Sequence, residues 1–179
     1  MTSEARRNEL IREIGAMRRY ARALTRDPAR ADDLVQDALL RAIQGADRLR
    51  DGAPLRPWLL TIVHNGFIDM RRAEQAEGRR REAVASDPVT PPGQEHAVRL
   101  GQVAAAFAAL PPEQRAVLHL VTVEGLSYAE AAVVLDVPIG TLMSRLGRAR
   151  AALRAMEAGS GDAGTPRLRL VGGGDDDAG

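Results

Sequence analysis

The residues best suited to a chemical task are the arginines that crowd one segment near the end of the chain, GTLMSRLGRARAALR (residues 140–154). Four arginines stand at positions 145, 148, 150 and 154, with no acidic residue until Glu157. Surface helices usually pair an arginine with an acidic residue four positions away. When a helix enters the major groove of DNA, arginine can donate two hydrogen bonds to guanine, and Ser or Thr can reach bases or phosphates. The unpaired arginines therefore indicate contact with DNA.

The same segment has the pattern of an amphipathic helix, in which successive residues turn by about 100°. Its apolar residues fall on one narrow face: Leu142, Leu146, Ala149 and Leu153. The opposite face is polar, with Arg145 at its edge: Thr141, Ser144 and Arg148. A helix of this kind can pack on a core and present the arginines outward.

A second, shorter helix is expected just before it. Ser127 and Glu130 have the spacing of a capping box, which begins a helix that runs to about Leu135. Asp136 occupies the turn, where a left-handed backbone is often needed and Asp is better tolerated than most residues. Pro138 restarts the helical pattern. This order matches a helix-turn-helix; two helices at a tight turn can also be plain packing, and the arginines favour DNA binding.

The remaining chain supports an all-α fold of two small helical domains joined by a flexible linker, the second containing the helix-turn-helix. Asp27-Pro28 interrupts the first helical pattern, because the residue before a proline avoids the helical conformation. Residues 74–99 are polar, contain three prolines and read as the linker, with at most a short helix at its start. Further helices are expected at 9–26, 31–44, 55–73, 100–110 and 111–125.

The overall composition excludes several classes of site. There is no cysteine, so disulfides, thiolate metal sites and cysteine nucleophiles are absent. Apolar runs are far too short for a membrane span, and MTSEARRNEL lacks the apolar core of a signal peptide, so a cytoplasmic protein is expected. The net charge is only +1, which argues against DNA binding unless the charge is unevenly distributed. Residues 1–72 hold 14 arginines against 10 acidic residues, a local excess of four.

Three blocks of the chain resemble the extracytoplasmic-function sigma factors, the short bacterial initiation factors of the sigma-70 type. They are YARALTRDPARADDLVQDALLRAI (20–43), LRPWLLTIVHNGFIDMRRA (55–73) and the segment from LPPEQRAV to RAALR (110–154). Each block alone is a weak pattern, whereas the three in the family's order are highly specific. Within the family the chain looks closest to the alphaproteobacterial group, and among these to the general-stress-response type.

The resemblance implies a division of labour between domains. Residues 1–73 would bind the polymerase clamp helices and the promoter's −10 element, 74–99 would be the linker, 100–157 would bind the −35 element, and 158–179 would form a disordered tail. Such a factor has no catalysis, cofactor or metal of its own, and the histidines at 64, 96 and 119 lack metal-ligand spacing. The expected partners are core RNA polymerase, promoter DNA and an anti-sigma factor, with no membrane contact and a monomer when free.

Individual roles follow from matching these blocks residue by residue. The polymerase-binding residues would be Asp32, Asp33, Gln36 and Asp37, for which the alternative is a solvated helix face. The residues at the −10 element would be Arg56, Asn65, Arg71 and Arg72; an amide can read a base edge, and arginines hold phosphates. The residues at the −35 element would be Thr141, Ser144, Arg145 and Arg148.

Several neighbouring residues are expected to be structural instead. Trp58 shares an apolar stripe with Leu59, so core packing is favoured over base stacking. Asp69 is expected to orient an arginine, because a carboxylate repels phosphate. His64 is expected at the surface. The alternative is a position near DNA, because its neighbour Asn65 is a candidate DNA contact. The linker is expected to prevent a core shared by the two domains, which would then separate in the free protein.

Two other functions remain as alternatives. A sigma-like decoy would bind an anti-sigma protein instead of DNA, and it would not need Arg145, Arg148 or Asn65. A helix-turn-helix repressor would need neither the first domain nor a polymerase-docking face, and would usually dimerise to read two half-sites. The presence of both sets of residues favours the sigma factor.

Overall fold

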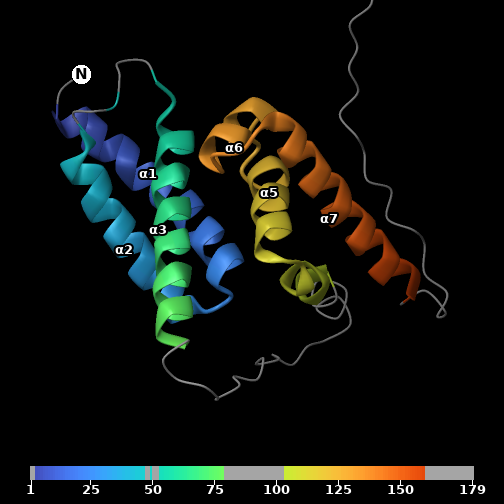
Figure 1. Ribbon diagram of the computed structural model, residues 1–179. Helices are drawn as coiled ribbons and strands as arrows, with labels where there is room; N and C mark the ends of the chain where they lie inside the picture. The colour runs from blue at the N-terminus through green and yellow to red at the C-terminus, as the bar shows by residue number, and fades with distance from the viewer. Residues whose placement is uncertain (1–2, 47–48, 50–52, 79–102, 160–179) are drawn as a thin grey trace, which may run out of the picture.

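The computed structural model describes residues 3–46, 49, 53–78 and 103–159, and all its regular elements are helices. Three long helices, each packed against the other two, form the first domain: α1 (Ser3–Thr25), α2 (Pro28–Gln44) and α3 (Leu55–Gly78). Residues 103–109 are helical and precede the other three helices of the second domain: α5 (Pro112–Thr122), α6 (Tyr128–Val134) and α7 (Ile139–Gly159). Figure 1 shows the two groups side by side.

The break between α1 and α2 forms where the sequence predicts it. Arg26 has a left-handed backbone (φ 60°), which ends α1. Asp27 caps α2, its carboxylate accepting hydrogen bonds from the backbone N–H groups of Ala29 (2.8 Å) and Arg30 (3.1 Å). Pro28 follows at the first helical position, where its missing N–H leaves no bond unmade. These two residues therefore turn the chain and begin the next helix.

The helix-turn-helix of α6 and α7 also has the predicted signals. Ser127 caps α6 by accepting from the backbone N–H of Glu130, whose carboxylate accepts from the Ser127 N–H in return. Gly125 supplies the left-handed backbone (φ 68°) before this cap. Asp136 lies in the turn with φ 50°, so the expected left-handed conformation is confirmed.

The apolar stripes predicted from the sequence mostly face the core. On α7, Leu142, Leu146 and Ala149 are buried and Leu153 packs against the core. Trp58 is partly buried and packs against the core, as expected. Ile43, placed on the apolar face of α2 by the sequence pattern, is instead 63% exposed. Its neighbour Ala42 is fully buried, so the face of α2 that reaches the core is narrower than the apolar pattern and excludes Ile43.

The two domains pack against each other through α1 with α5 and α3 with α6. One cluster of buried apolar side chains includes Met17 and Tyr20 of α1 as well as Val117 and Leu120 of α5. The expectation that the linker would prevent a shared core is therefore wrong. Linker composition decides whether that segment enters a core, and it leaves the apolar faces of the flanking helices free to meet.

Two segments of the predicted organisation extend beyond the described residues. The helix α3 continues to Gly78, so the start of the predicted linker is helical, and residues 79–102 lie outside the described part. The segment predicted as a disordered tail is described only to Gly159. Within the described ranges, no helix is long and apolar enough to span a membrane.

Candidate nucleic-acid interface

The helix α7 holds its polar residues on the side away from the core, as a reading helix must. Ser144 and Arg148 are exposed, whereas Thr141 and Arg145 are half-buried. The Arg148 guanidinium donates a hydrogen bond from Nη2 to Ser144 Oγ at 2.8 Å, one helical turn away. On contact with a base, Arg148 would give up this hydrogen bond and donate to guanine instead. The bond to Ser144 is exposed, so water can take its place and its loss costs little free energy.

The exposed edge of α3 carries residues predicted to contact the −10 element. Asn65 and Arg72 are exposed, and Asp69 forms an ion pair with Arg41 of α2, whose Nη1 lies 3.4 Å from Asp69 Oδ2. The expectation that Asp69 orients an arginine fits this contact, although the arginine comes from a neighbouring helix. Arg71 lies 6.0 Å above the ring of Phe67, which keeps its guanidinium near the edge of the helix.

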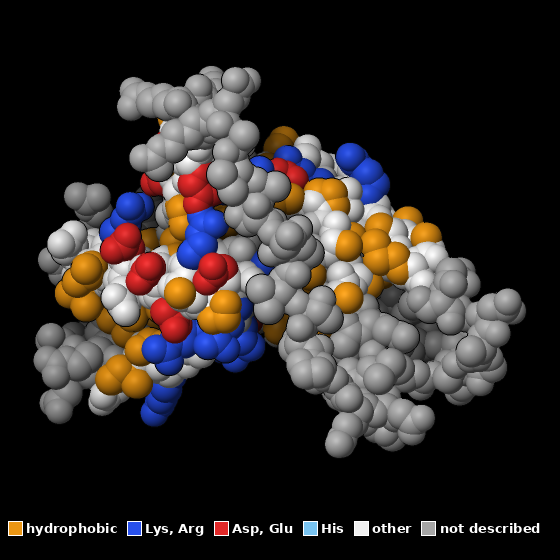
Figure 2. Space-filling model, turned by 90° about the horizontal axis from the view of Figure 1, so that it is seen from below, with side chains coloured by type: hydrophobic (Ala, Val, Ile, Leu, Met, Phe, Trp, Pro, Cys, Tyr) orange, Lys and Arg blue, Asp and Glu red, His pale blue; other side chains and the backbone are white. Residues whose placement is uncertain are grey.

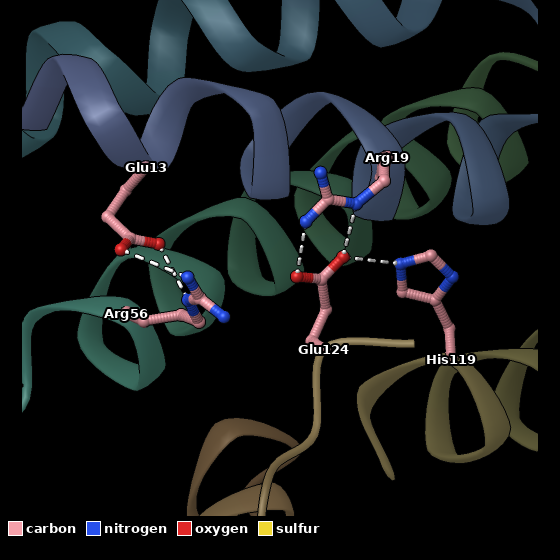
Figure 3. A network of polar contacts seen from close by, with 5 residues as sticks. All are labelled: Glu13, Arg19, Arg56, His119 and Glu124. Carbon is pink, nitrogen blue, oxygen red and sulfur yellow. Dashed lines mark hydrogen bonds and ion pairs between the residues drawn. The ribbon is translucent and has the colours of Figure 1, made fainter. Parts of the chain in front are cut away.

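Arg56, at the start of α3, is held by a carboxylate of α1. Its Nε and Nη2 donate to the two carboxylate oxygens of Glu13 at 2.7 and 3.2 Å (Figure 3). This hydrogen bond raises the pKa of Arg56, although the guanidinium is charged at any physiological pH in either case. The pair fixes the direction of the Arg56 side chain at the start of α3.

The acidic set of α2 divides between two faces. Asp33, Gln36 and Asp37 are exposed and, at spacings of three and four, share one side of the helix. Asp32 is half-buried on the side of α1, where its Oδ1 lies 3.6 Å from Nε of Arg18. The structure therefore brings three of the four predicted residues together and sets Asp32 beside them. Figure 2 shows acidic and basic side chains interspersed on the first domain.

A buried ionic network between the domains was not predicted from the sequence. Glu124, in the loop after α5, has a side chain with no exposed surface. Its carboxylate accepts two hydrogen bonds from Arg19 of α1, from Nε at 3.0 Å and from Nη2 at 2.9 Å, and lies 3.1 Å from Nε2 of His119 (Figure 3). The hydrogen bond to Glu124 raises the pKa of Arg19. Because the pair is bidentate, it also fixes the orientation of the two side chains.

Arg115 of α5 forms a second connection between the domains that the sequence did not reveal. It is 4% exposed, and its guanidinium donates to the last carbonyls of α1, those of Ala23 (2.5 Å) and Leu24 (3.1 Å). It also donates to the carbonyls of Ala108 and Leu110 in its own domain. These carbonyls at the end of α1 have no partner within the helix, and a cation there is favoured by the helix dipole.

His64 lies at the interface between the domains, so the expectation of a surface histidine is wrong. Its Nδ1 shares a 3.0 Å hydrogen bond with the hydroxyl of Tyr20, which is fully buried and stacks on His119. Burial lowers the pKa of His64 to about 4, and the nearby charge of Arg145 acts in the same direction. Burial also lowers the pKa of His119. Both histidines are therefore neutral at neutral pH.

No group of three or more metal-binding side chains occurs in the part of the chain that the structure describes.

The contacts between the domains could not be predicted from the sequence, because the partners lie far apart along the chain. Arg19 and Glu124 are 105 positions apart, and Arg115 and Ala23 are 92 apart. One local feature could have indicated the role of Arg115. It stands in the segment PPEQRAVLHL, next to apolar residues that the helical pattern places on the buried face.

Comparisons with known proteins match the same two regions of the chain to one family. Residues 10–77 match the family model of sigma-70 region 2, and residues 100–153 match that of sigma-70 region 4. The chain is 35% identical to the ECF RNA polymerase sigma factor EcfG of Rhodopseudomonas palustris over 86% of either chain. It is 39% identical to SigL of Mycobacterium tuberculosis over 76% of this chain and 79% of SigL.

A solved structure supports the same likeness. The sigma factor RpoE of Bartonella quintana, determined in complex with the anti-sigma factor NepR, is 31% identical in sequence. The match covers 87% of this chain and 98% of RpoE, with a TM-score of 0.73.

The low pKa of His64 predicts how stability depends on pH. Because the folded pKa is about 4 and the unfolded value 6.5, the unfolded chain takes up a proton between these values and the folded chain does not. The free energy of unfolding is therefore full above pH 6.5 and falls as the pH decreases towards 4, by roughly 2–3 kcal/mol from this residue. Urea unfolding at pH 7.5 and 4.5 measures the loss.

His64→Gln is the matched variant, because it keeps a hydrogen-bonding group beside Tyr20 and cannot take up the proton. Its unfolding free energy should fall less over the same pH interval than that of the parent protein, since the carboxylates contribute equally to both. Parallel pH dependences for the two proteins would contradict the burial of a neutral His64.

Proposed function

This chain belongs to the extracytoplasmic-function sigma factors of RNA polymerase, and we propose that it acts in the cytoplasm as a promoter-specificity subunit with no catalysis of its own. The resemblance and the all-helical fold with two sigma domains are confirmed. The chain therefore directs promoter-specific initiation of transcription. The alphaproteobacterial general-stress group fits both EcfG of Rhodopseudomonas palustris and the match to RpoE of Bartonella quintana.

The observation that carries the assignment at the −35 element is the two-sided character of α7. Leu142, Leu146 and Ala149 fix the helix to its domain, and the outward side presents a hydroxyl and a guanidinium one turn apart. An α-helix fits the major groove, where an arginine can take both acceptors of a guanine. Four residues are assigned to this contact: Thr141, Ser144, Arg145 and Arg148.

We assign the −10 element to the exposed edge of α3 and the residue that precedes it. An exposed Asn65 has the amide needed to read a base edge, and Arg72 can hold a phosphate. Arg71 and Arg56 are each held by a carboxylate in this form of the protein, Arg71 by Glu113 at 3.4 Å. Opening of the strand at this site would need contacts that offset a few kcal/mol per extruded base.

Docking on the polymerase is assigned to α2. Asp33, Gln36 and Asp37 make one polar helix face that a partner helix can cover, and Asp32 supports it from the side of α1. The proposed roles use the predicted limits 1–73, 74–99, 100–157 and 158–179, with the boundary between the first two moved to Gly78, where α3 ends. The complex of RpoE with the anti-sigma factor NepR supports an anti-sigma partner for this chain too.

The decoy and repressor alternatives are less well supported. A decoy that only binds an anti-sigma protein has no use for the outward Ser144 and Arg148 of α7. A repressor has no use for a first domain that matches sigma region 2. Neither alternative is favoured by a separate observation on the described residues.

Replacement of Arg148 should weaken recognition of the −35 element. A bidentate contact between arginine and guanine discriminates by roughly 1–3 kcal/mol, so Arg148→Ala should lower initiation from a cognate promoter about tenfold or more. Arg154→Ala is the matched control, because Arg154 is exposed on the same helix nearer the phosphate edge, and it should act less and without sequence preference. If the Arg148→Ala variant initiates at the wild-type rate from a promoter that needs its −35 element, Arg148 does not read that element.

The protein alone should bind promoter DNA weakly and become specific with core polymerase. Its net charge of +1 gives little attraction to phosphate, and the polymerase would hold both domains on one duplex so that the second contact becomes intramolecular. Gel shifts with protein, polymerase and both together measure this difference. The double variant Asp33→Arg/Asp37→Arg should lose the joint complex and its transcription, and Glu9→Arg, an exposed acid of α1, should keep both.

Tight, sequence-specific binding by the protein alone would contradict the proposed function and favour the repressor. Retention of the joint complex by Asp33→Arg/Asp37→Arg would place the polymerase contact elsewhere. Circular dichroism of the variants should match that of the parent protein, because both replaced side chains are exposed.

A further inference from the structure

The outward side of α7 carries two large apolar side chains that do not enter the contacts assigned above. Met143 is 54% exposed, and Ile139, one helical turn before it, is 51% exposed. The leucines on either side of Met143 along the helix, Leu142 and Leu146, are buried and fix α7 to its domain. Single exposed apolar residues are common on protein surfaces, so the position of Met143 has to decide what it contacts.

Met143 lies on one flank of the proposed DNA-reading side of α7, and Arg148 lies on the other. At about 100° per residue, Ser144 falls between them, about 100° from Met143 and about 40° from Arg148. Ser144 and Arg148 are joined by a hydrogen bond of 2.8 Å on their flank. Because Met143 directly precedes Ser144, its exposed side chain is continuous with the proposed −35 surface.

The surface between the two flanks has no long side chain. Gly147 and Ala151 are exposed there, and a Cβ at Gly147 would meet no neighbouring atom within 4 Å. Packing therefore does not require glycine at position 147, although glycine in a helix interior is less stable than alanine. The missing side chain leaves both flanks uncovered, so the edges of a groove can approach Met143 and Arg148 together.

The major groove contains one apolar group that a methionine can recognise. Thymine presents a C5 methyl group there, whereas the other bases present hydrogen-bond donors and acceptors. A thioether is at most a weak acceptor and donates no hydrogen bond, so it distinguishes bases through that methyl group. The methionine side chain is unbranched and adapts to the shape of its partner.

The position of Met143 along α7 also suits a base contact. In a helix-turn-helix, residues near the N-terminus of the reading helix contact base edges. Met143 comes four residues after Ile139, where α7 begins, and precedes Arg148 by five residues. At about 1.5 Å per residue, these two lie about 7.5 Å apart along the helix axis, so both contacts fit within one short element. Ile139 is nearer the turn and has a stiffer, β-branched side chain.

We propose that Met143 is a specificity-determining residue, which reads the methyl group of a thymine in the −35 element. This role rests on the proposed function, because it requires α7 to lie in the major groove at that element. It adds a base to the proposed readout: an A·T pair beside the guanine that Arg148 is proposed to contact.

Replacement of single thymines by deoxyuridine tests the contact, because uracil lacks only the C5 methyl group and keeps the hydrogen-bonding groups of thymine. Duplex promoters carry one replacement at a time in the −35 element, on either strand. Initiation is measured with core polymerase at a limiting concentration of this protein. At one position the parent should initiate about fourfold more slowly on the uracil duplex, the factor expected for one buried methyl group. Met143→Ala should be slower than the parent on thymine and equal on both duplexes.

Met156→Ala is the matched control, because it is the same substitution on the same helix at a residue that is 37% exposed. Position 156 lies thirteen residues further along α7, about 20 Å away, so the variant should keep the parent's dependence on the methyl group. Equal rates on thymine and uracil at every −35 position for the parent would overturn the role of Met143. So would a methyl dependence that Met143→Ala keeps or that Met156→Ala loses, and an element without an A·T pair.

Failure of the proposed function gives a different result. If the parent with core polymerase initiates from no promoter, or initiates without regard to the −35 element, the proposed function is refuted and the role of Met143 with it. If initiation depends on the −35 element but on no thymine methyl group, only the role of Met143 is refuted.

Discussion

The carboxylate of Glu124, buried between the two domains, is the constraint on which the arrangement of the domains depends. Apolar side chains of α1 and α5 supply area at this interface, but area alone tolerates several alignments. A buried charge does not, because only a bidentate partner at the right position compensates its lost hydration. Arg19 is that partner, and His119 completes the set. The stack of Tyr20 on His119 and the bond of Tyr20 to His64 then follow from the same alignment.

Arginine serves two purposes in this chain, and both use its planar, bidentate geometry. All 25 basic residues are arginine. Arg19, Arg26 and Arg115 bind a carboxylate and backbone carbonyls between the domains, whereas Arg148 faces outward on α7. A net charge of +1 is compatible with the proposed DNA-binding role under this division. Several arginines form ion pairs with acidic side chains of the chain itself, among them Arg19, Arg41 and Arg56, whereas, among the described residues, the exposed side chain of Arg148 bonds only to Ser144. Specificity then comes from position more than from long-range attraction.

The sequence predicted what depends on neighbours along the chain. The caps at Asp27 and Ser127, the left-handed Asp136 and the buried face of α7 all follow from residues within a few positions of each other. The misses depend on distant partners. The burial of His64 and the role of Arg115 require the second domain to pack on the first, and no periodicity contains that information. The DNA and polymerase residues were predicted from family motifs, and the structure adds which of them are exposed, paired or turned towards the other domain.

If the two domains read two separate promoter elements, as proposed, the most direct test is to prevent the domains from separating. Arg26 reaches the carbonyl of Ala108, so Arg26→Cys and Ala109→Cys place two thiols on opposite sides of the domain interface, and a short, cleavable bis-maleimide can join them. Initiation from a cognate promoter with core polymerase should be lost in the linked protein and return when the linker is cleaved. Initiation by the intact linked protein at the rate of the unlinked one would contradict the account.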